Sequence, residues 1–335
     1  MSSPHTPSPD LFFDTAFAPQ RNAALKTAID LEVFTAIDDG AAKVSEIAAR
    51  CGASERGIRI LCDTLTTMGF LTKTAGRYGL TEDSTTFLSK RSAAYLGGTL
   101  EFLHMPELAQ GFENLTETVR RGTIEASKDL IAPENPIWVR FARAMVPMMM
   151  PAVQAIPDIL GTAANGPIRI LDIAAGHGMF GIALAQRNPA AEVVAVDWPQ
   201  VLSVATENAA AMGVAGRYRT LAGDAFTVDY ASGFDVALLT NFLHHYDPTA
   251  CVGLLRKVAA ALKPGGRVVL LEFVPNEDRV TPTMAARFSL TMLAETAGGD
   301  AYTFRELRGM LAEAGFSDAS AHPVPGPETV VVATK

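Results

Sequence analysis

Cysteine is scarce in this chain. Only three cysteines occur among the 335 residues, at Cys51, Cys62 and Cys251, and no two of them form a Cys-x-x-Cys pair. An odd number of widely spaced cysteines argues against a disulfide framework and against a cysteine-based zinc site. The sequence therefore predicts a reduced, cytoplasmic protein.

Long apolar runs are absent as well. Every hydrophobic stretch is interrupted by a charged residue, a glycine or a proline well short of the ~20 residues that a membrane-spanning helix needs. The first ten residues are rich in serine and proline and lack the basic and apolar regions of a secretory signal. We therefore expect no membrane partner, and we expect residues 1–10 to form a disordered tail.

Basic residues are outnumbered by acidic ones. The chain has 28 Lys and Arg against 36 Asp and Glu, which gives a formal net charge of -8. Such a surface repels a phosphate backbone, so nucleic acid is not expected as a partner. Hydrophobic residues make up 48% of the chain, enough for substantial cores. The length suggests two domains, at ~150 residues per domain.

The N-terminal part has the element order of a winged helix. Apolar residues recur at helical spacing over Leu11–Ile37, and a second helix is expected over Val44–Cys51, where Gly52 ends it. Ser54 is placed to cap a third helix that runs to about Met68. A two-stranded wing is expected over Leu71–Thr81, with its turn at Ala75-Gly76.

A winged helix either reads DNA or serves as a packing and dimerisation module. The third helix offers only Arg56 and Arg59 as bases, and residues 1–130 hold 13 Lys and Arg against 17 Asp and Glu. A DNA-binding domain normally carries a basic face. The sequence therefore favours a helical winged-helix dimerisation domain over residues 11–92.

A helical connector is expected over residues 93–163, with a break around Ala132 to Pro136. It contains a methionine-rich run from Arg143 to Ala152. Methionine is flexible and fills irregular apolar space, so this run is either ordinary core or one wall of a substrate pocket. Its position just before the C-terminal domain favours the pocket.

From residue 164 to residue 335 the pattern changes to strands that alternate with helices. Continuous Val, Ile and Leu runs between helices are typical of a buried parallel sheet, so we predict a doubly wound, Rossmann-like α/β domain. The expected strands are Ile168–Ile173, Val193–Asp197, Tyr218–Leu221, Phe234–Thr240 and Arg267–Phe273. The expected helices are Phe180–Arg187, Gln200–Met212, Pro248–Leu262 and Thr303–Gly315.

The strongest local signal is the segment ILDIAAGHGMFG, which begins at Ile170. It reads as a strand, a turn of small residues and a helix whose free N–H groups face a ligand. By itself this pattern also fits an NAD site or simple packing. Asp197 ends the second strand and is placed to accept the ribose hydroxyls of a nucleotide. Asp224 is a candidate acceptor for an adenine amino group, with Phe226 or Trp198 against the ring.

Four segments, LDIAAGHG, VDWPQV, GDAF and LKPGGRVVLLEF, occur in this order and spacing. Together they resemble the motif series of class I S-adenosylmethionine-dependent methyltransferases. With the winged-helix front half, the chain resembles the two-domain O-methyltransferases of plant phenolic and bacterial natural-product metabolism. The resemblance implies a homodimer through the N-terminal helices and a seven-stranded sheet with an antiparallel last strand near Thr329–Ala333. It implies S-adenosylmethionine as cofactor and S-adenosylhomocysteine as product. The expected cofactor residues are Asp172, Ala174, Gly176, Gly178, Asp197, Trp198, Gly223, Asp224, Ala225, Phe226 and Asn241.

This sequence departs from the family's pattern at two places. Family loops usually have glycine where this chain has Ala174 and Ala175. Two acids usually flank the family's base, and Ala301 stands where the second acid is expected. Asp300 is adjacent to that position, and we expect it to point elsewhere.

The expected chemistry lies in the segment after the fourth strand. Methyl transfer to a hydroxyl needs a base with a pKa near neutral, and histidine suits this role. By the resemblance, His244 is favoured as the general base, neighbouring His245 is the other candidate catalytic histidine, and Glu272 is the first supporting acid. The acceptor is expected to be a small molecule with a phenolic or enolic hydroxyl.

Several alternatives stay open on the sequence alone. One alternative is methylation of the carbon beside the carbonyl of a 2-oxo acid. The absence of the second acid at Ala301 would then reflect this different reaction. A metal held by His244, His245 and Glu295 would be compatible with that chemistry, although no metal site is our first expectation. A relative that binds the cofactor without transferring methyl, and a winged-helix regulator, are the remaining candidates.

Overall fold

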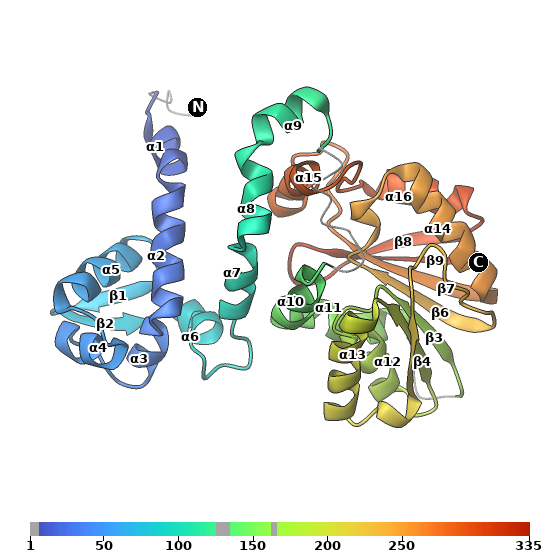
Figure 1. Cartoon of the computed structure of the whole chain (residues 1–335), viewed down its shortest axis with the longest axis horizontal. Coiled ribbons are helices and arrows are strands. Elements are labelled where there is room, and N and C mark those ends of the chain that lie inside the picture. The colour runs from blue at the N-terminus through green and yellow to red at the C-terminus, as the bar shows by residue number, and fades with distance from the viewer. Residues whose placement is uncertain (1–6, 125–134, 162–165) are drawn as a thin grey trace, which may run out of the picture. The chain divides into compact units, whose positions relative to one another are not determined.

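The computed structural model describes residues 7–124, 135–161 and 166–335 (Figure 1). It divides the chain into two compact units, Met1–Glu101 and Phe102–Lys335. Of the expected disordered tail, residues 1–6 lie outside the described residues. No helix among the described residues is both long and apolar enough to cross a membrane.

The first unit has the expected order of helices followed by a wing. Ser54 Oγ accepts the backbone N–H of Gly57, which caps α5 as predicted. The wing pairs antiparallel, with Leu71 opposite Leu80. Its elements are α1 (Asp10–Ala16), α2 (Ala18–Asp30), α3 (Val33–Asp38), α4 (Val44–Cys51), α5 (Glu55–Thr67), β1 (Leu71–Thr74), β2 (Arg77–Leu80) and α6 (Glu82–Leu88).

The expectation of one continuous helix over Leu11–Ile37 is wrong. The structure has three helices in this stretch, separated at Phe17 and at Leu31–Glu32. Pro19 at the start of α2 lacks the N–H that a continuous helix would need, and Glu32 adopts a left-handed φ of 55°. Apolar periodicity therefore indicated helical structure but not the breaks, and only the later part of the stretch, including Ala28 and Phe34, is buried in this chain.

Short helices lead from the wing to the sheet. The methionine-rich run lies mainly on α11, which ends at Gly161 in a left-handed conformation. The predicted break around Ala132 to Pro136 lies mostly outside the described residues. The helices are α7 (Gly97–Leu103), α8 (Pro106–Glu113), α9 (Leu115–Arg121), α10 (Ile137–Ala144) and α11 (Val146–Leu160).

The second unit is built on a seven-stranded sheet with the order β5-β4-β3-β6-β7-β9-β8. The first five strands in this order pair in parallel, and β9 pairs antiparallel with both β7 and β8. The predicted antiparallel strand near Thr329–Ala333 is therefore confirmed, whereas β8 was not anticipated. The strands are β3 (Arg169–Ile173), β4 (Glu192–Asp197), β5 (Tyr218–Ala222), β6 (Phe234–Thr240), β7 (Leu262–Glu272), β8 (Ser317–Pro323) and β9 (Thr329–Thr334).

Helices cover both faces of this sheet, as Figure 1 shows. On β3, Ile170 joins one core with α11, α12 and α13, while Leu171 joins the other with α14 and α16. This alternation is the period of two that a strand imposes on its side chains. The remaining elements are α12 (Met179–Arg187), α13 (Pro199–Ala211), η2 (Ala215–Arg217), η3 (Leu243–His245), α14 (Pro248–Ala261), α15 (Thr283–Glu295) and α16 (Phe304–Glu313).

Candidate active site

A cavity lies at the carboxyl ends of β3, β4, β5 and β6, where ligands bind in open α/β sheets. This cavity is lined by eight of the eleven residues that were predicted from the sequence to bind the cofactor. Trp138 and Phe141 of α10 line it too, and sequence reasoning missed them. The eight nominated residues are Ala174, Gly176, Asp197, Trp198, Gly223, Asp224, Ala225 and Asn241.

Three nominated residues do not line this cavity. Asp172 is fully buried beneath the loop, where its Oδ2 accepts the Gly181 backbone N–H at 3.1 Å. A Cβ on Gly178 would stand 2.5 Å from the Tyr218 hydroxyl, so a side chain there is excluded by packing. Phe226 packs against the Tyr246 ring, with centroids 4.8 Å apart. Their assignment to the cofactor site therefore stays a prediction, whereas the structure gives each of them packing or hydrogen bonds beside or beneath the cavity.

Asp197 is the most constrained acid on the cavity wall. Its Oδ2 accepts the backbone N–H of Gly176 at 2.8 Å, and its Oδ1 accepts that of Trp198 at 2.7 Å. Burial raises the pKa of this carboxyl to about 6, against the opposing effect of those two N–H groups. Each carboxylate oxygen can accept a further hydrogen bond, so the side chain is positioned to bind a pair of hydroxyls.

The loop after β3 contains an unusual alanine. Ala174 has a φ of 53°, in the left-handed region where a Cβ costs roughly 1–2 kcal/mol. Glycine at this position would adopt the conformation without that cost. The departure noted in the sequence therefore leaves the turn intact and makes it more strained.

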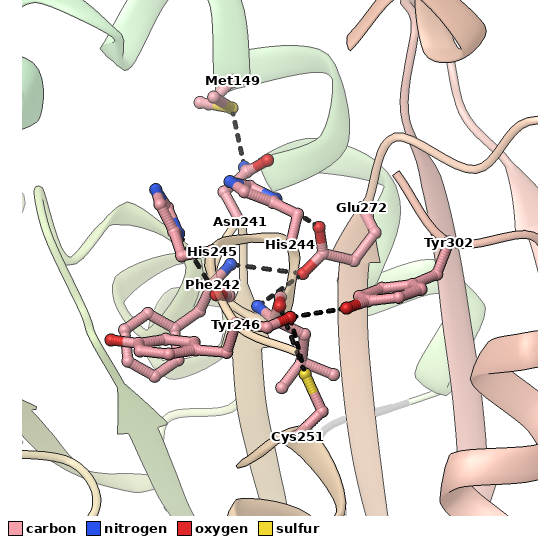
Figure 2. A network of polar contacts seen from close by, with 10 residues as sticks. Met149, Asn241, Phe242, His244, His245, Tyr246, Cys251, Glu272 and Tyr302 are labelled. Atoms are coloured by element: carbon pink, nitrogen blue, oxygen red, sulfur yellow. Dashed lines mark hydrogen bonds and ion pairs between the residues drawn. The ribbon is translucent and has the colours of Figure 1, made fainter. Parts of the chain in front are cut away.

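Glu272, the last residue of β7, organises the segment after β6 (Figure 2). Its Oε1 accepts the backbone N–H groups of Phe242 and Leu243, at 3.2 and 2.9 Å. Its Oε2 lies 2.5 Å from His244 Nδ1. An ionised carboxylate only accepts hydrogen bonds, so a neutral His244 carries its proton on Nδ1 and keeps a lone pair on Nε2.

His245 has a different environment. Its Nδ1 lies 3.2 Å from the carbonyl oxygen of Phe242, and its ring packs edge-on against Trp138. Burial, helped by neighbouring His244, holds the pKa of His245 well below its usual range. His245 is therefore a neutral wall residue at physiological pH.

A second cavity, of about 520 Å³, lies beside the first. His244 lines only this cavity, whereas four residues line both: Trp138, Phe141, Asn241 and His245. Its wall is mostly apolar. The methionine-rich run contributes Met145, Met148 and Met149. Met145 and Met149 are also buried core residues, so the run both fills the core and lines this cavity.

No acid occupies the position of the family's second supporting acid. Ala301 is fully buried and packs in a small cluster with Phe273 and Ala285. Asp300 forms an ion pair with Arg279 at 3.0 Å, so it points elsewhere as expected. In the described parts of the chain, no three His, Cys, Asp or Glu side chains are grouped so that they could hold a metal ion.

Comparison with known proteins identifies the family. Residues 157–317 match a family model described as the O-methyltransferase domain, and residues 13–90 match the O-methyltransferase dimerisation domain. The 3-hydroxy-5-methyl-1-naphthoate 3-O-methyltransferase of Streptomyces sahachiroi is 30% identical over 99% of this chain and 97% of its own length. The chain belongs to the O-methyltransferase family. This O-methyltransferase is thus an enzyme that uses S-adenosylmethionine.

Other relatives extend the comparison. An L-tyrosine C(3)-methyltransferase of Streptomyces lavendulae is 27% identical over 93% of this chain and 88% of its own length. A solved Nostoc punctiforme structure described as an O-methyltransferase superposes with a TM-score of 0.94 at 50% identity, over 99% of this chain and 100% of that one. Human N-acetylserotonin methyltransferase, solved with S-adenosylmethionine, gives a TM-score of 0.84 at 21% identity, over 100% and 99% of the two chains. At that identity, the human structure shows the fold alone.

Proposed function

We propose that this enzyme transfers the methyl group to a phenolic or enolic oxygen of a small, largely apolar acceptor. One observation carries the proposal: Glu272 fixes His244 from one side, and the same histidine lines the cavity beside the cofactor cavity. A neutral imidazole held in this way is a suitable general base for a hydroxyl.

The chemistry divides between the cofactor and the chain. When bound, S-adenosylmethionine supplies an electrophilic methyl group on a sulfonium centre. His244 Nε2 takes the hydroxyl proton, and the Glu272 carboxylate stabilises the imidazolium that results. The acceptor oxygen forms the new bond to carbon, and the electron pair of the broken carbon–sulfur bond stays on sulfur. The apolar walls exclude water and hold the acceptor in line.

The cofactor cavity has features that fit this group. We assign the ribose hydroxyls to Asp197, the methionine end to the loop of Ala174 and Gly176, and the adenine to Asp224 with Trp198 against the ring. Asn241 adds a polar side chain to the same wall, and its amide interacts with the buried carboxyl of Glu328.

Methylation of carbon is the second candidate. The tyrosine C(3)-methyltransferase among the relatives and the absence of an acid at Ala301 both favour it. The naphthoate named for the Streptomyces sahachiroi relative, together with the apolar acceptor cavity, supports an aromatic ring carrying a hydroxyl.

The test is carbon NMR on products formed from methyl-labelled S-adenosylmethionine with a panel of phenols and 2-oxo acids. We expect the label at an O-methyl chemical shift, with S-adenosylhomocysteine formed in equal amount. A label at a C-methyl shift would establish the second candidate in place of the first.

Cofactor affinity should depend on pH through Asp197. Burial raises the pKa of this carboxyl to about 6, so protonation below that pH removes acceptor capacity that the ribose hydroxyls need. Affinity for S-adenosylmethionine should therefore fall as the pH drops from about 7 to about 5. Calorimetry across this range tests the prediction, with Asp197→Asn as control because neighbouring Asp172 and His177 also titrate. A fall that persists in the variant would assign the effect to another group.

We also propose that the enzyme is a homodimer. The match to the dimerisation domain supports this. Three large apolar side chains of α1, Leu11, Phe12 and Phe13, are exposed, and so is Phe17 directly after it. Residues 11–92 would form the dimer, residues 93–163 would contribute to the acceptor cavity, and residues 164–335 would bind the cofactor. Sedimentation should give twice the chain mass, and Phe12→Ser with Phe13→Ser should shift the enzyme toward one chain mass. An unchanged mass in the variant would remove α1 from the interface.

A further inference from the structure

One face of α15 runs along the acceptor cavity. A spacing of three or four residues places side chains on one side of a helix, and every cavity-lining residue of α15 follows that spacing. The stripe consists of Met284, Arg287, Phe288, Thr291, Met292 and Glu295.

Among the described residues that line this cavity, Glu295 is the only acid, and it is largely buried. The structure gives its carboxyl no hydrogen bond or ion pair with any described residue. Burial raises its pKa to about 7, and no charge among the described residues contributes to that shift. An unpaired carboxyl in an apolar wall is costly unless a ligand supplies its partner.

Glu295 does not replace the missing second acid beside the base. The His244 ring instead meets Phe288 edge-on, with centroids 4.9 Å apart, and Phe288 stacks on Phe273 at 3.9 Å. Glu295 lies seven residues beyond Phe288, roughly 10 Å further along the helix axis at the usual rise per residue. Its carboxyl is therefore available to a part of the acceptor remote from the reacting oxygen.

Arg287 does not neutralise Glu295 either. Of the described residues that line the cavity, it is the only Lys or Arg. It is exposed, and it stands eight residues away on the same helix, roughly 12 Å along the axis. Near Glu295, the described wall consequently offers one potential negative charge and no fixed positive charge. A cation on the acceptor would complete that pair, whereas a carboxylate placed there would be repelled.

We propose that Glu295 is a specificity-determining residue that selects acceptors carrying a protonated nitrogen, remote from the hydroxyl that is methylated. The proposal rests on the proposed function for the position of that hydroxyl beside His244. The acceptor class is thus a phenol with a basic side chain. The ammonium group of that side chain pairs with Glu295, and the phenol ring fills the apolar space between His244 and Glu295.

Binding to the enzyme in its S-adenosylhomocysteine complex tests this without requiring turnover. The ligands are para-substituted phenols whose ammonium group stands on a chain of one to four methylenes, each compared by calorimetry with the alkyl phenol of equal length. A charge-assisted hydrogen bond to a buried carboxylate contributes about 1.5–3 kcal/mol, so the best amine should bind roughly 10- to 100-fold more tightly than its alkyl counterpart.

Two variants and one control complete the design. Glu295→Gln and Glu295→Leu should abolish the preference for the amine, and both remove an unpaired carboxyl, so thermal melts should show folded proteins. Glu107→Gln removes an exposed carboxyl from α8, which packs against α15 but contributes Leu108 to the cavity instead of Glu107. That control should keep the preference of the parent enzyme.

The outcomes separate this proposal from the function on which it rests. Equal binding of amines and alkyl phenols across the series, or a preference that survives in Glu295→Gln, would overturn the role of Glu295. O-methylation of the neutral phenols by way of His244 would stand in that case. Conversely, a preference for amines that depends on Glu295, without any O-methyl product, would support the recognition site and reject the proposed reaction.

Discussion

Replacing His244 with alanine is expected to lower kcat roughly 10²–10⁴-fold, the usual contribution of a general base. Among the described residues of the acceptor cavity wall, only this imidazole combines a free lone pair with a supporting carboxylate, through its bond to Glu272. Affinity for S-adenosylmethionine should not change, because His244 does not line the cofactor cavity. Steady-state kinetics and calorimetry on the same preparation measure both quantities.

The pKa of the acceptor sharpens this test. A phenol that is already ionised at the assay pH needs no base, so the loss in His244→Ala should shrink strongly for nitrophenols. A purely structural role would give the same loss for every acceptor. Glu272→Gln should show a smaller loss with the same dependence, since it acts by positioning His244. His322→Ala, on strand β8, is the matched control and should leave kcat unchanged. Parental rates in His244→Ala would remove the histidine from the mechanism.

Replacing Asp197 with alanine is expected to weaken S-adenosylmethionine binding roughly 100-fold or more. Two hydrogen bonds to a charged acceptor contribute about 1.5–3 kcal/mol each, and a factor of ten corresponds to about 1.4 kcal/mol. The same substitution also releases the backbone N–H groups of Gly176 and Trp198, which loosens the cavity wall. Calorimetric titration with S-adenosylhomocysteine measures the loss without turnover.

Two further variants separate these contributions. Asp197→Asn keeps one carbonyl oxygen as an acceptor, so its affinity should fall between those of the parent and the alanine variant. Glu192→Ala removes an exposed carboxyl from the opposite end of the same strand and should bind like the parent. If Asp197→Ala bound with parental affinity, the ribose would have to be held elsewhere on the wall.

The sequence predicted the sheet well because its central strands are buried on both faces. Continuous apolar runs such as Phe234–Thr240 have no other plausible state, and β6 has these same bounds. By contrast, β8 lies at the sheet edge, is mostly exposed and has little apolar pattern to detect. The helix α15 was not predicted from the sequence either, because its start has neither a capping side chain nor an acidic first turn.

Site residues could be predicted from the sequence only where they belong to a motif with a fixed spacing along the chain. Strand-end residues such as Asp197 and Asn241 follow from motif spacing, since parallel strands bring their carboxyl ends to one edge. Trp138 comes from a separate helix, and no spacing rule connects it with that edge. Asp172 and Gly178 belong to the motif, but their packing beneath the loop is a three-dimensional property that the motif alone does not reveal.

The wall shared by the two cavities has a consequence for how this enzyme can change. A substitution at Trp138, Phe141, Asn241 or His245 alters the surroundings of donor and acceptor at once, so new acceptor scope gained there comes with altered donor affinity. Residues of the α15 stripe line only the acceptor cavity. Divergence toward new acceptors, in nature or in directed evolution, should therefore accumulate along α15 while the shared wall stays fixed.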